Sequence, residues 1–146
     1  MELIEAIGAG PVAIETAIFI YFIEQHPRFA PPLQPLFAAI DAGAVKAVTS
    51  AVTLLETLVV PYRAGDETLA AAYEAILTNG RGLTLVPIDL SLARLAAQLR
   101  ATSRLRTPDA LQLATALSMR CTAFLTNDRR VPLLRPLTVL QLADFA

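Results

Sequence analysis

Short hydrophobic runs alternate with longer segments of helical period along the whole chain. The runs are too short for helices, so we interpret them as buried strands. They cover residues 12–14, 45–48, 83–86, 123–125 and 137–139. The intervening segments have apolar positions at helical spacing and typical start or stop residues. They cover residues 17–25, 33–42, 51–63, 66–77, 90–102 and 107–120.

Several of these segments begin with side chains that favour helix starts. Thr16, Ser50 and Asp89 each stand where an N-cap residue is expected. Thr107-Pro108 predicts a cap followed by proline at the first helical position. The proline-rich residues 27–35 are interpreted as a rigid loop between helices.

The alternation of short strands with helices predicts an α/β fold, a mostly parallel five-stranded sheet covered by helices on both faces. In such sheets ligands bind beyond the carboxyl ends of the strands, where the strand order switches. The residues that follow each strand are therefore the first candidates for a functional site.

Composition narrows the class of protein. The chain has 146 residues, 55% of them hydrophobic and 17% charged, which favours one domain over residues 1–146 and an apolar surplus suited to a homo-oligomer. The longest apolar runs are too short for a membrane helix, and the acidic N-terminus is unlike a secretory signal, so we expect a cytoplasmic protein without a membrane partner. With one cysteine (Cys121) and one histidine (His26), a disulfide framework and a Cys- or His-based zinc site are excluded. A bound metal would need carboxylate ligands.

Charge is unevenly distributed along the chain. Residues 1–93 hold ten acids and four bases, whereas residues 94–135 hold eight arginines and only two acids. Arginine forks suit phosphate groups, so Arg104, Arg106, Arg129 and Arg130 are candidate contacts for a nucleic-acid backbone. A solvated helix face would explain any one of these arginines equally well.

Four acids stand where a site is expected. Glu15 and Asp128 follow strands, and Glu56 and Asp109 lie on helices that follow other strands. Each has a simpler interpretation, as a helix-dipole partner, a turn residue or part of a solvated face. Carboxylates held together repel one another unless a cation lies among them, and oxygen-only sites favour Mg²⁺ or Mn²⁺. Such a site can cleave a phosphodiester without histidine or lysine.

Four segments that carry these acids resemble the PIN domain, the fold of VapC-type toxin ribonucleases. They are residues 13–21 (AIETAIFIY), 50–56 (SAVTLLE), 107–114 (TPDALQLA) and 124–130 (FLTNDRR). The resemblance implies a three-layer α/β/α sandwich and a Mg²⁺- or Mn²⁺-dependent endoribonuclease whose products carry a 5′-phosphate and a 3′-hydroxyl. It also implies the toxin half of a type II toxin–antitoxin system, with an RNA substrate, a cognate antitoxin and a homodimer.

The resemblance also assigns roles to individual residues. Glu15, Asp109 and Asp128 would coordinate the metal, Glu56 would bind metal or orient water, and Thr126 would position the water or a neighbouring carboxylate. The first acid of the family is usually aspartate, and here it is Glu15, whose extra methylene moves the carboxylate by about 1.5 Å. Glutamine also stands at position 112, where the family often has histidine.

Two other classes of protein remain open alternatives. A catalytically inactive PIN-like binding or interaction module would explain the unusual Glu15. Another α/β domain with an acidic pocket fits less well, because the chain has Lys46 as its single lysine, no Asp-x-Asp after the first strand and no glycine-rich loop after a strand.

Overall fold

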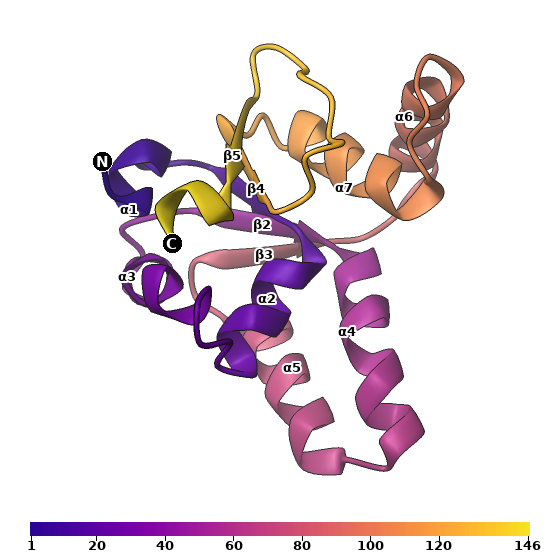
Figure 1. Cartoon of the computed structure of the whole chain (residues 1–146). Helices are drawn as coiled ribbons and strands as arrows, with labels where there is room; N and C mark the ends of the chain where they lie inside the picture. The colour runs from indigo at the N-terminus through magenta and orange to yellow at the C-terminus, as the bar shows by residue number, and fades with distance from the viewer.

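The computed structural model describes residues 1–146 and contains five strands, seven α-helices and one 3₁₀ helix. The strands are β1 (Val12–Ile14), β2 (Ala47–Ser50), β3 (Leu83–Val86), β4 (Ala123–Thr126) and β5 (Thr138–Gln141). The helices are α1 (Leu3–Ile7), α2 (Thr16–Ile23), α3 (Ala30–Asp41), α4 (Ala51–Ala64), α5 (Glu67–Asn79), α6 (Leu90–Ala101) and α7 (Thr107–Ser118), and the 3₁₀ helix is η1 (Leu142–Phe145). Figure 1 shows how they surround the sheet.

All five strands are parallel and lie in the order β3-β2-β1-β4-β5. The predicted α/β class with a five-stranded sheet is confirmed. The strand order reverses between β1 and β4, so the chain leaves these two neighbours towards opposite faces of the sheet. A crevice forms at such a point, outside the carboxyl ends of the strands.

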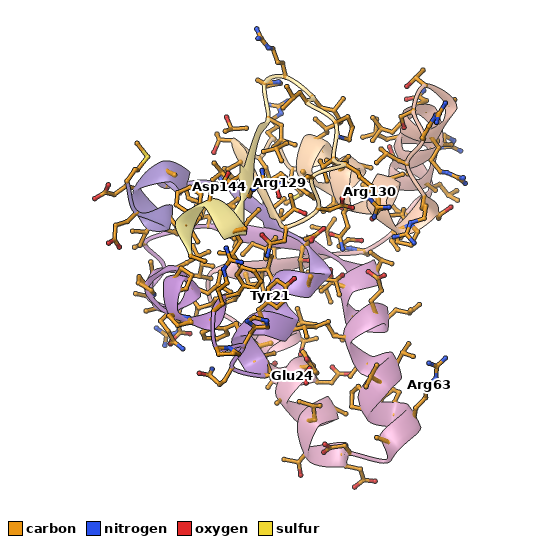
Figure 2. The ribbon with its side chains drawn as sticks, in the orientation of Figure 1. Tyr21, Glu24, Arg63, Arg129, Arg130 and Asp144 are labelled. Atoms are coloured by element: carbon orange, nitrogen blue, oxygen red, sulfur yellow. The ribbon has the colours of Figure 1, made fainter.

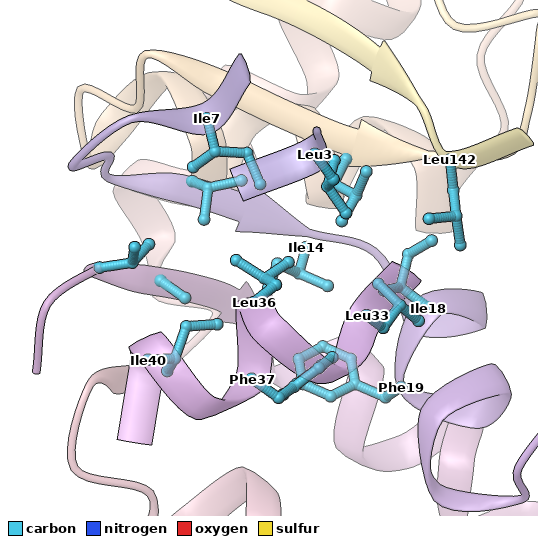
Figure 3. Close-up of a cluster of buried hydrophobic side chains, with 14 of the residues drawn as sticks. Leu3, Ile7, Ile14, Ile18, Phe19, Leu33, Leu36, Phe37, Ile40 and Leu142 are labelled. Atoms are coloured by element: carbon cyan, nitrogen blue, oxygen red, sulfur yellow. The ribbon is translucent and has the colours of Figure 1, made fainter. Parts of the chain in front are cut away.

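Alternate strand residues enter two hydrophobic cores, one on each face of the sheet. Val12 and Ile14 of β1 pack in the larger core with residues of α1, α2 and α3, as Figure 3 shows for part of that core. Ala13 points to the other face, where Leu113 of α7 and Phe124 of β4 lie. Burial on both faces is why the strands read as continuous apolar runs instead of alternating ones.

Helices α4 and α5 form an antiparallel hairpin that extends away from the sheet (Figure 1). Ser50 ends β2 and caps α4 by accepting a hydrogen bond from the Val52 amide, as predicted. Gly65, with φ of 65°, ends α4 in the left-handed conformation that glycine adopts without strain. The Asp66 carboxylate then caps α5.

Several predicted boundaries are wrong. Glu15, not Thr16, holds the N-cap position of α2, and Arg106, not Thr107, holds that of α7, which puts Pro108 at the second helical residue. Helix α3 begins at Ala30, inside the predicted loop, because prolines in a first helical turn remove only amides that have no intrahelical partner. The short α1 and η1 were not predicted.

None of the helices is both long enough and apolar enough to cross a lipid bilayer.

Candidate active site

The reversal of strand order places the ends of β1 and β4 side by side. Glu15 follows β1 directly, and its amide donates to the Leu125 carbonyl of β4 at 3.3 Å. Asp128 follows β4 by two residues. The sheet therefore brings together two acids that are more than a hundred residues apart in the sequence.

The Glu15 side chain is partly buried at the N-cap position of α2, where it makes no capping hydrogen bond. Burial raises the pKa of Glu15, interactions with the Thr126 hydroxyl and the Asn127 backbone oppose the rise, and the charges of Asp128 and Asp109 add to it. The helix-dipole interpretation of Glu15 thus accounts for its position at the start of α2 but not for its burial beside two other acids.

Asp128 is held by its backbone and by an arginine. The Thr126 hydroxyl accepts from the Asp128 amide at 2.9 Å, and Nε2 of Gln141 donates to the Asp128 carbonyl at 3.1 Å. The Arg130 guanidinium binds both carboxylate oxygens, each at 3.0 Å, which lowers the pKa of Asp128. The fully buried Thr126 therefore contacts the Asp128 backbone and also lowers the pKa of Glu15.

Asp109 lies in the first turn of α7, where the helix dipole favours an acid. Its Oδ2 is 3.3 Å from Nε of Arg106, the residue at the N-cap position. The loop before α7 is held by Arg100, which donates to the Leu105 carbonyl at 2.9 Å and to the Thr107 hydroxyl at 3.0 Å.

Glu56 is fixed by a network of buried polar side chains. The Gln112 amide nitrogen donates to the Thr16 hydroxyl at 3.1 Å and to the Thr53 hydroxyl at 2.8 Å. The Thr16 hydroxyl donates in turn to Oε1 of Glu56 at 2.7 Å. Because Thr53 is fully buried and Glu56 partly so, the solvated-face interpretation of this side of α4 is wrong.

The second branch of this network runs down to the sheet. The Thr49 hydroxyl of β2 donates to the Ile14 carbonyl at 2.7 Å, so its oxygen accepts from the Thr53 hydroxyl at 2.8 Å. The network thus joins β1, β2, α2, α4 and α7 beneath Glu56.

The four predicted acids line a common pocket of about 270 Å³. Its lining residues come from α2, α4, α7 and the loops around them: Glu15, Thr16, Ala17, Ile20, Glu56, Arg106, Asp109, Gln112 and Asp128. A second pocket, of about 410 Å³, adjoins it and shares Arg106, Asp109 and Asp128 with it. Arg104 and Arg130 also line this second pocket, which we call the arginine pocket.

Arg129, the remaining candidate for nucleic-acid contact, lines neither pocket. Its guanidinium pairs with Asp144 of η1 at 2.7 Å. Figure 2 shows Arg129 beside Asp144 and Arg130 nearer to α7. The structure therefore brings Arg104, Arg106 and Arg130 together and leaves Arg129 outside.

The acidic pocket has the donor chemistry of a divalent-cation site. All four of its acids offer oxygen ligands, and the pKa of Glu15 is raised in part by repulsion from two of them, which a bound cation would relieve. In the present arrangement no three acidic, histidine or cysteine side chains lie close enough to share one ion. Asp109 and Asp128 are paired with arginines instead.

The supporting roles of four further residues were not predicted from the sequence. Thr49, Thr53 and Gln112 carry the polar network, and Gln141 supports the Asp128 carbonyl. For Thr53 the signal was present, because it shares a helical face with Glu56. Gln112 stands one helical turn after Asp109, and no local pattern in the sequence distinguishes Gln141.

The fold and the pocket together define an α/β protein with carboxylates gathered at the switch point of a parallel sheet. Residues 12–135 match the PIN domain family, and the chain belongs to that family. No curated protein has a matching sequence.

Solved structures share this fold. A chain of a toxin–antitoxin complex from Klebsiella pneumoniae has a TM-score of 0.67 and 21% identity, over 90% of this chain and 97% of that one. VapBC2 from Rickettsia felis, bound to a DNA fragment from its promoter, has a TM-score of 0.67 and 16% identity, over 89% and 97%. The Mycobacterium tuberculosis toxin VapC20, which cleaves the sarcin–ricin loop, has a TM-score of 0.63 and 16% identity, over 77% and 86%.

Proposed function

We propose that the protein is a Mg²⁺- or Mn²⁺-dependent endoribonuclease and the toxin of a type II toxin–antitoxin system. The observation that carries the proposal is the convergence of Glu15, Glu56, Asp109 and Asp128 on one pocket at the switch point of the sheet. Membership of the PIN family and the similarity in fold to toxin–antitoxin proteins support it.

The residues divide into ligands and supports. Glu15, Asp109 and Asp128 would hold the cation, which would lower the pKa of a water and polarise the scissile phosphate. Glu56 would bind the cation as well or accept a proton from the attacking water, with its carboxylate fixed by the hydrogen bond from Thr16. Thr126, whose hydroxyl accepts from the Asp128 amide, would position the water or a neighbouring carboxylate. Arg104, Arg106 and Arg130 are the proposed contacts to the RNA backbone.

A cleavage assay tests the activity directly. Purified protein is incubated with a labelled structured RNA, or DNA of the same sequence, under Mn²⁺, Mg²⁺ or EDTA, beside Asp109→Asn and the exposed control Glu74→Gln. We expect RNA cleavage that needs metal and Asp109, with 5′-phosphate and 3′-hydroxyl ends. Cleavage that persists in Asp109→Asn would show that the pocket is not the active site.

The second candidate function is a binding module without catalysis. It is favoured by the arrangement of the acids, since no three of them lie within reach of one ion. It predicts that the chain binds RNA or a protein partner and leaves RNA intact even at high Mn²⁺. The same assay, read for RNA retention on a native gel, separates the two functions.

Glu15 can be tested by restoring the usual aspartate of the family. Glu15→Asp shortens the side chain by one methylene, about 1.5 Å, and we expect it to keep or increase Mg²⁺-dependent cleavage. A large loss of cleavage in Glu15→Asp would mean that the rest of this pocket is adapted to glutamate.

Exposed apolar residues on α4 favour a surface that binds another protein. Leu55, Val60 and Tyr62 are each more than 60% exposed. We infer that this helix takes part in a homodimer or in binding a cognate antitoxin, and that the protein acts in the cytoplasm.

Light scattering tests the dimer, for which the expected mass is twice that of one chain. Growth arrest on expression, relieved by a co-expressed antitoxin, tests the toxin assignment.

A further inference from the structure

Both carboxylate oxygens of Asp128 are occupied by one guanidinium. Nε and an Nη of Arg130 each lie 3.0 Å from a different oxygen, a bidentate pair. Arg106 pairs with Asp109 at 3.3 Å in the same wall. These are two of the acids that the proposed function assigns to the cation. A divalent cation and a guanidinium compete for the same oxygen atoms, so the cation must displace the arginines or share these oxygens with them.

The two arginine side chains are free to move away from the acids. The Arg130 side chain is 78% exposed and that of Arg106 is 71% exposed, whereas the carboxylates are only 24% and 28% exposed. The acid side chains are thus largely covered by the protein, and the arginines reach them from solvent. An exposed ion pair of this kind is weak enough to be replaced by a better ligand.

The arginine pocket offers a place for the displaced guanidiniums. Arg104, Arg106 and Arg130 all line this 410 Å³ space, which opens beside the acidic pocket. Arg104 makes no ion pair. Three guanidinium groups around one space suit the two non-bridging oxygens of a phosphodiester.

We propose that Arg106 and Arg130 shield the metal-binding oxygens of Asp109 and Asp128 until an RNA phosphodiester draws them into the arginine pocket, so that RNA and divalent cation bind cooperatively. This inference rests on the proposed function, because it assumes the acidic pocket as the cation site. It adds a reciprocal coupling that family membership does not imply: RNA must tighten metal binding by the same factor by which metal tightens RNA binding.

Metal affinity of the protein without RNA gives the first test. Mn²⁺ binding is measured by calorimetry on wild type, Arg130→Gln and Arg129→Gln. Arg129 is the matched control, since it is the adjacent arginine but pairs with Asp144 outside both pockets. Removing the competing guanidinium should tighten Mn²⁺ binding by up to about fivefold, the range expected for an exposed ion pair, and the control should match wild type.

RNA binding gives the second test. A 2′-O-methylated RNA, verified on gels to stay intact, is titrated with and without Mn²⁺ over a range of salt concentrations. Arg130→Gln should lower the slope of log affinity against log salt by about one and should reduce the mutual enhancement of RNA and Mn²⁺ binding. Inorganic phosphate is tested as a free anion in place of RNA and should give little enhancement.

Several outcomes would overturn the inference. They are weaker or unchanged Mn²⁺ binding in Arg130→Gln, no effect of RNA on Mn²⁺ affinity in wild type, and an equal effect of inorganic phosphate. If any of these is found while wild type still cleaves RNA in a metal- and Asp109-dependent manner, the inference fails and the proposed function stands. Arg130 is exposed, so loss of fold is not expected, and thermal unfolding checks this.

Discussion

The amide of Gln112 sets the direction of the hydrogen bonds beneath the acidic pocket. Its nitrogen has only donors, so the Thr16 and Thr53 hydroxyls both accept from it. The Thr16 hydroxyl then donates its own hydrogen to Oε1 of Glu56. One oxygen of Glu56 is therefore fixed by Thr16, and the side chain lines the acidic pocket.

Replacing Gln112 should disturb Glu56 more than the fold around it. In Gln112→Leu, Thr16 loses its donor partner and no longer holds Glu56 in one direction. Loss of such a supporting partner typically costs 10–100-fold in metal affinity or activity, and we expect a fall in kcat of about that size with KM little changed. Steady-state cleavage measures this, with exposed Gln98→Leu as the control. Gln112→His, which keeps a donor, should retain more activity, and equal activity in all three variants would rule out a positioning role.

Glu15 is an acid whose folded environment disfavours its charge. Its pKa is raised above the ordinary value, mainly by burial, so the folded chain binds its proton more tightly than the unfolded chain does. Stability therefore falls as pH rises from the unfolded pKa through the folded one, and the penalty is fully present above that window. Asp128 has the opposite sign: its lowered pKa stabilises the fold above its ordinary pKa, and this stabilisation is lost in acid.

We predict that Glu15→Gln stabilises the metal-free protein at pH 7–8. The neutral amide removes the ionisation penalty, and each ~1 kcal/mol relieved raises Tm by about 2–4 °C in a domain of this size. Thermal unfolding across pH 4–8 measures it: the variant and wild type should converge at low pH and separate as pH rises. A difference in Tm that does not depend on pH would contradict the assigned cause.

Residues whose role in the site depends on long-range contacts could not be predicted from the sequence. Glu15 and Asp128 could be predicted because they follow strands, and Glu56 and Asp109 because they lie on helices with recognisable starts. Gln141 could not, because its role depends on β5 lying beside β4, where its amide meets the Asp128 carbonyl. The position of Gln112 beneath Glu56 likewise depends on how α7 packs against α4.

At the scale of elements, prediction succeeded where a segment is long or buried on both sides. The strands and the six longer helices were found because their hydrophobic runs or periods extend over enough residues. The five-residue α1 shows too little of a period to be recognised, although Leu3 and Ile7 pack into the main core. Strand β2 continues to Ser50, two residues past its predicted end, because the sheet includes the polar Thr49 and Ser50. Strand β5 likewise ends two residues later than predicted, at Gln141.

The loop between α6 and α7 depends on one arginine. Arg100 bridges the Leu105 carbonyl and the Thr107 hydroxyl, and so holds the segment that carries Arg104, Arg106 and the start of α7. This arginine belongs to the cluster that suggests nucleic-acid contact, yet its guanidinium is engaged with the loop. We interpret it as a support for the arginine pocket.

Arg100→Met should loosen this loop and leave the rest of the molecule folded. The lost hydrogen bonds are exposed, so we expect a decrease of about 0.5–1 kcal/mol in the free energy of unfolding. Hydrogen exchange should rise at the amides of residues 102–107, and RNA affinity should fall. Arg94→Met on the same helix, whose side chain makes no hydrogen bond within the chain, is the control, and equal exchange in the two variants would count against the role of Arg100.

At the scale of the whole molecule, the chain separates its charges between two parts. The acidic first part supplies α1 to α5, and the arginine-rich part supplies α6, α7, β4 and the loop that follows β4. The acidic pocket lies where these parts meet, with Glu15 and Glu56 from one and Asp109 and Asp128 from the other. Basic residues around an acidic centre suit a polyanionic substrate that approaches a cation site.

Because the pocket is built from both parts, cation binding should stabilise the whole fold. Cys121, between α7 and β4, offers a way to measure this. Cys121 is 6% exposed and packs with Ala116 and Phe124 in the core, and burial raises the pKa of its thiol to about 11. At pH 8 only about a thousandth of such a thiol is ionised, so an aromatic disulfide reagent should react slowly until the chain unfolds.

We predict that Mn²⁺ slows the labelling of Cys121 by a factor that grows with the ratio of its concentration to its Kd. A ligand that binds only the folded state lowers the unfolded fraction. If the thiol reacts only in unfolded molecules, labelling should slow about 100-fold when Mn²⁺ is at 100 times its Kd. Absorbance of the released thiol measures the rate. Asp109→Asn should remove most of the protection, and Glu74→Gln should keep it. If Mn²⁺ fails to slow the labelling of wild type both alone and with the uncleavable RNA present, the folded chain does not bind the cation, which would favour the binding module over the nuclease.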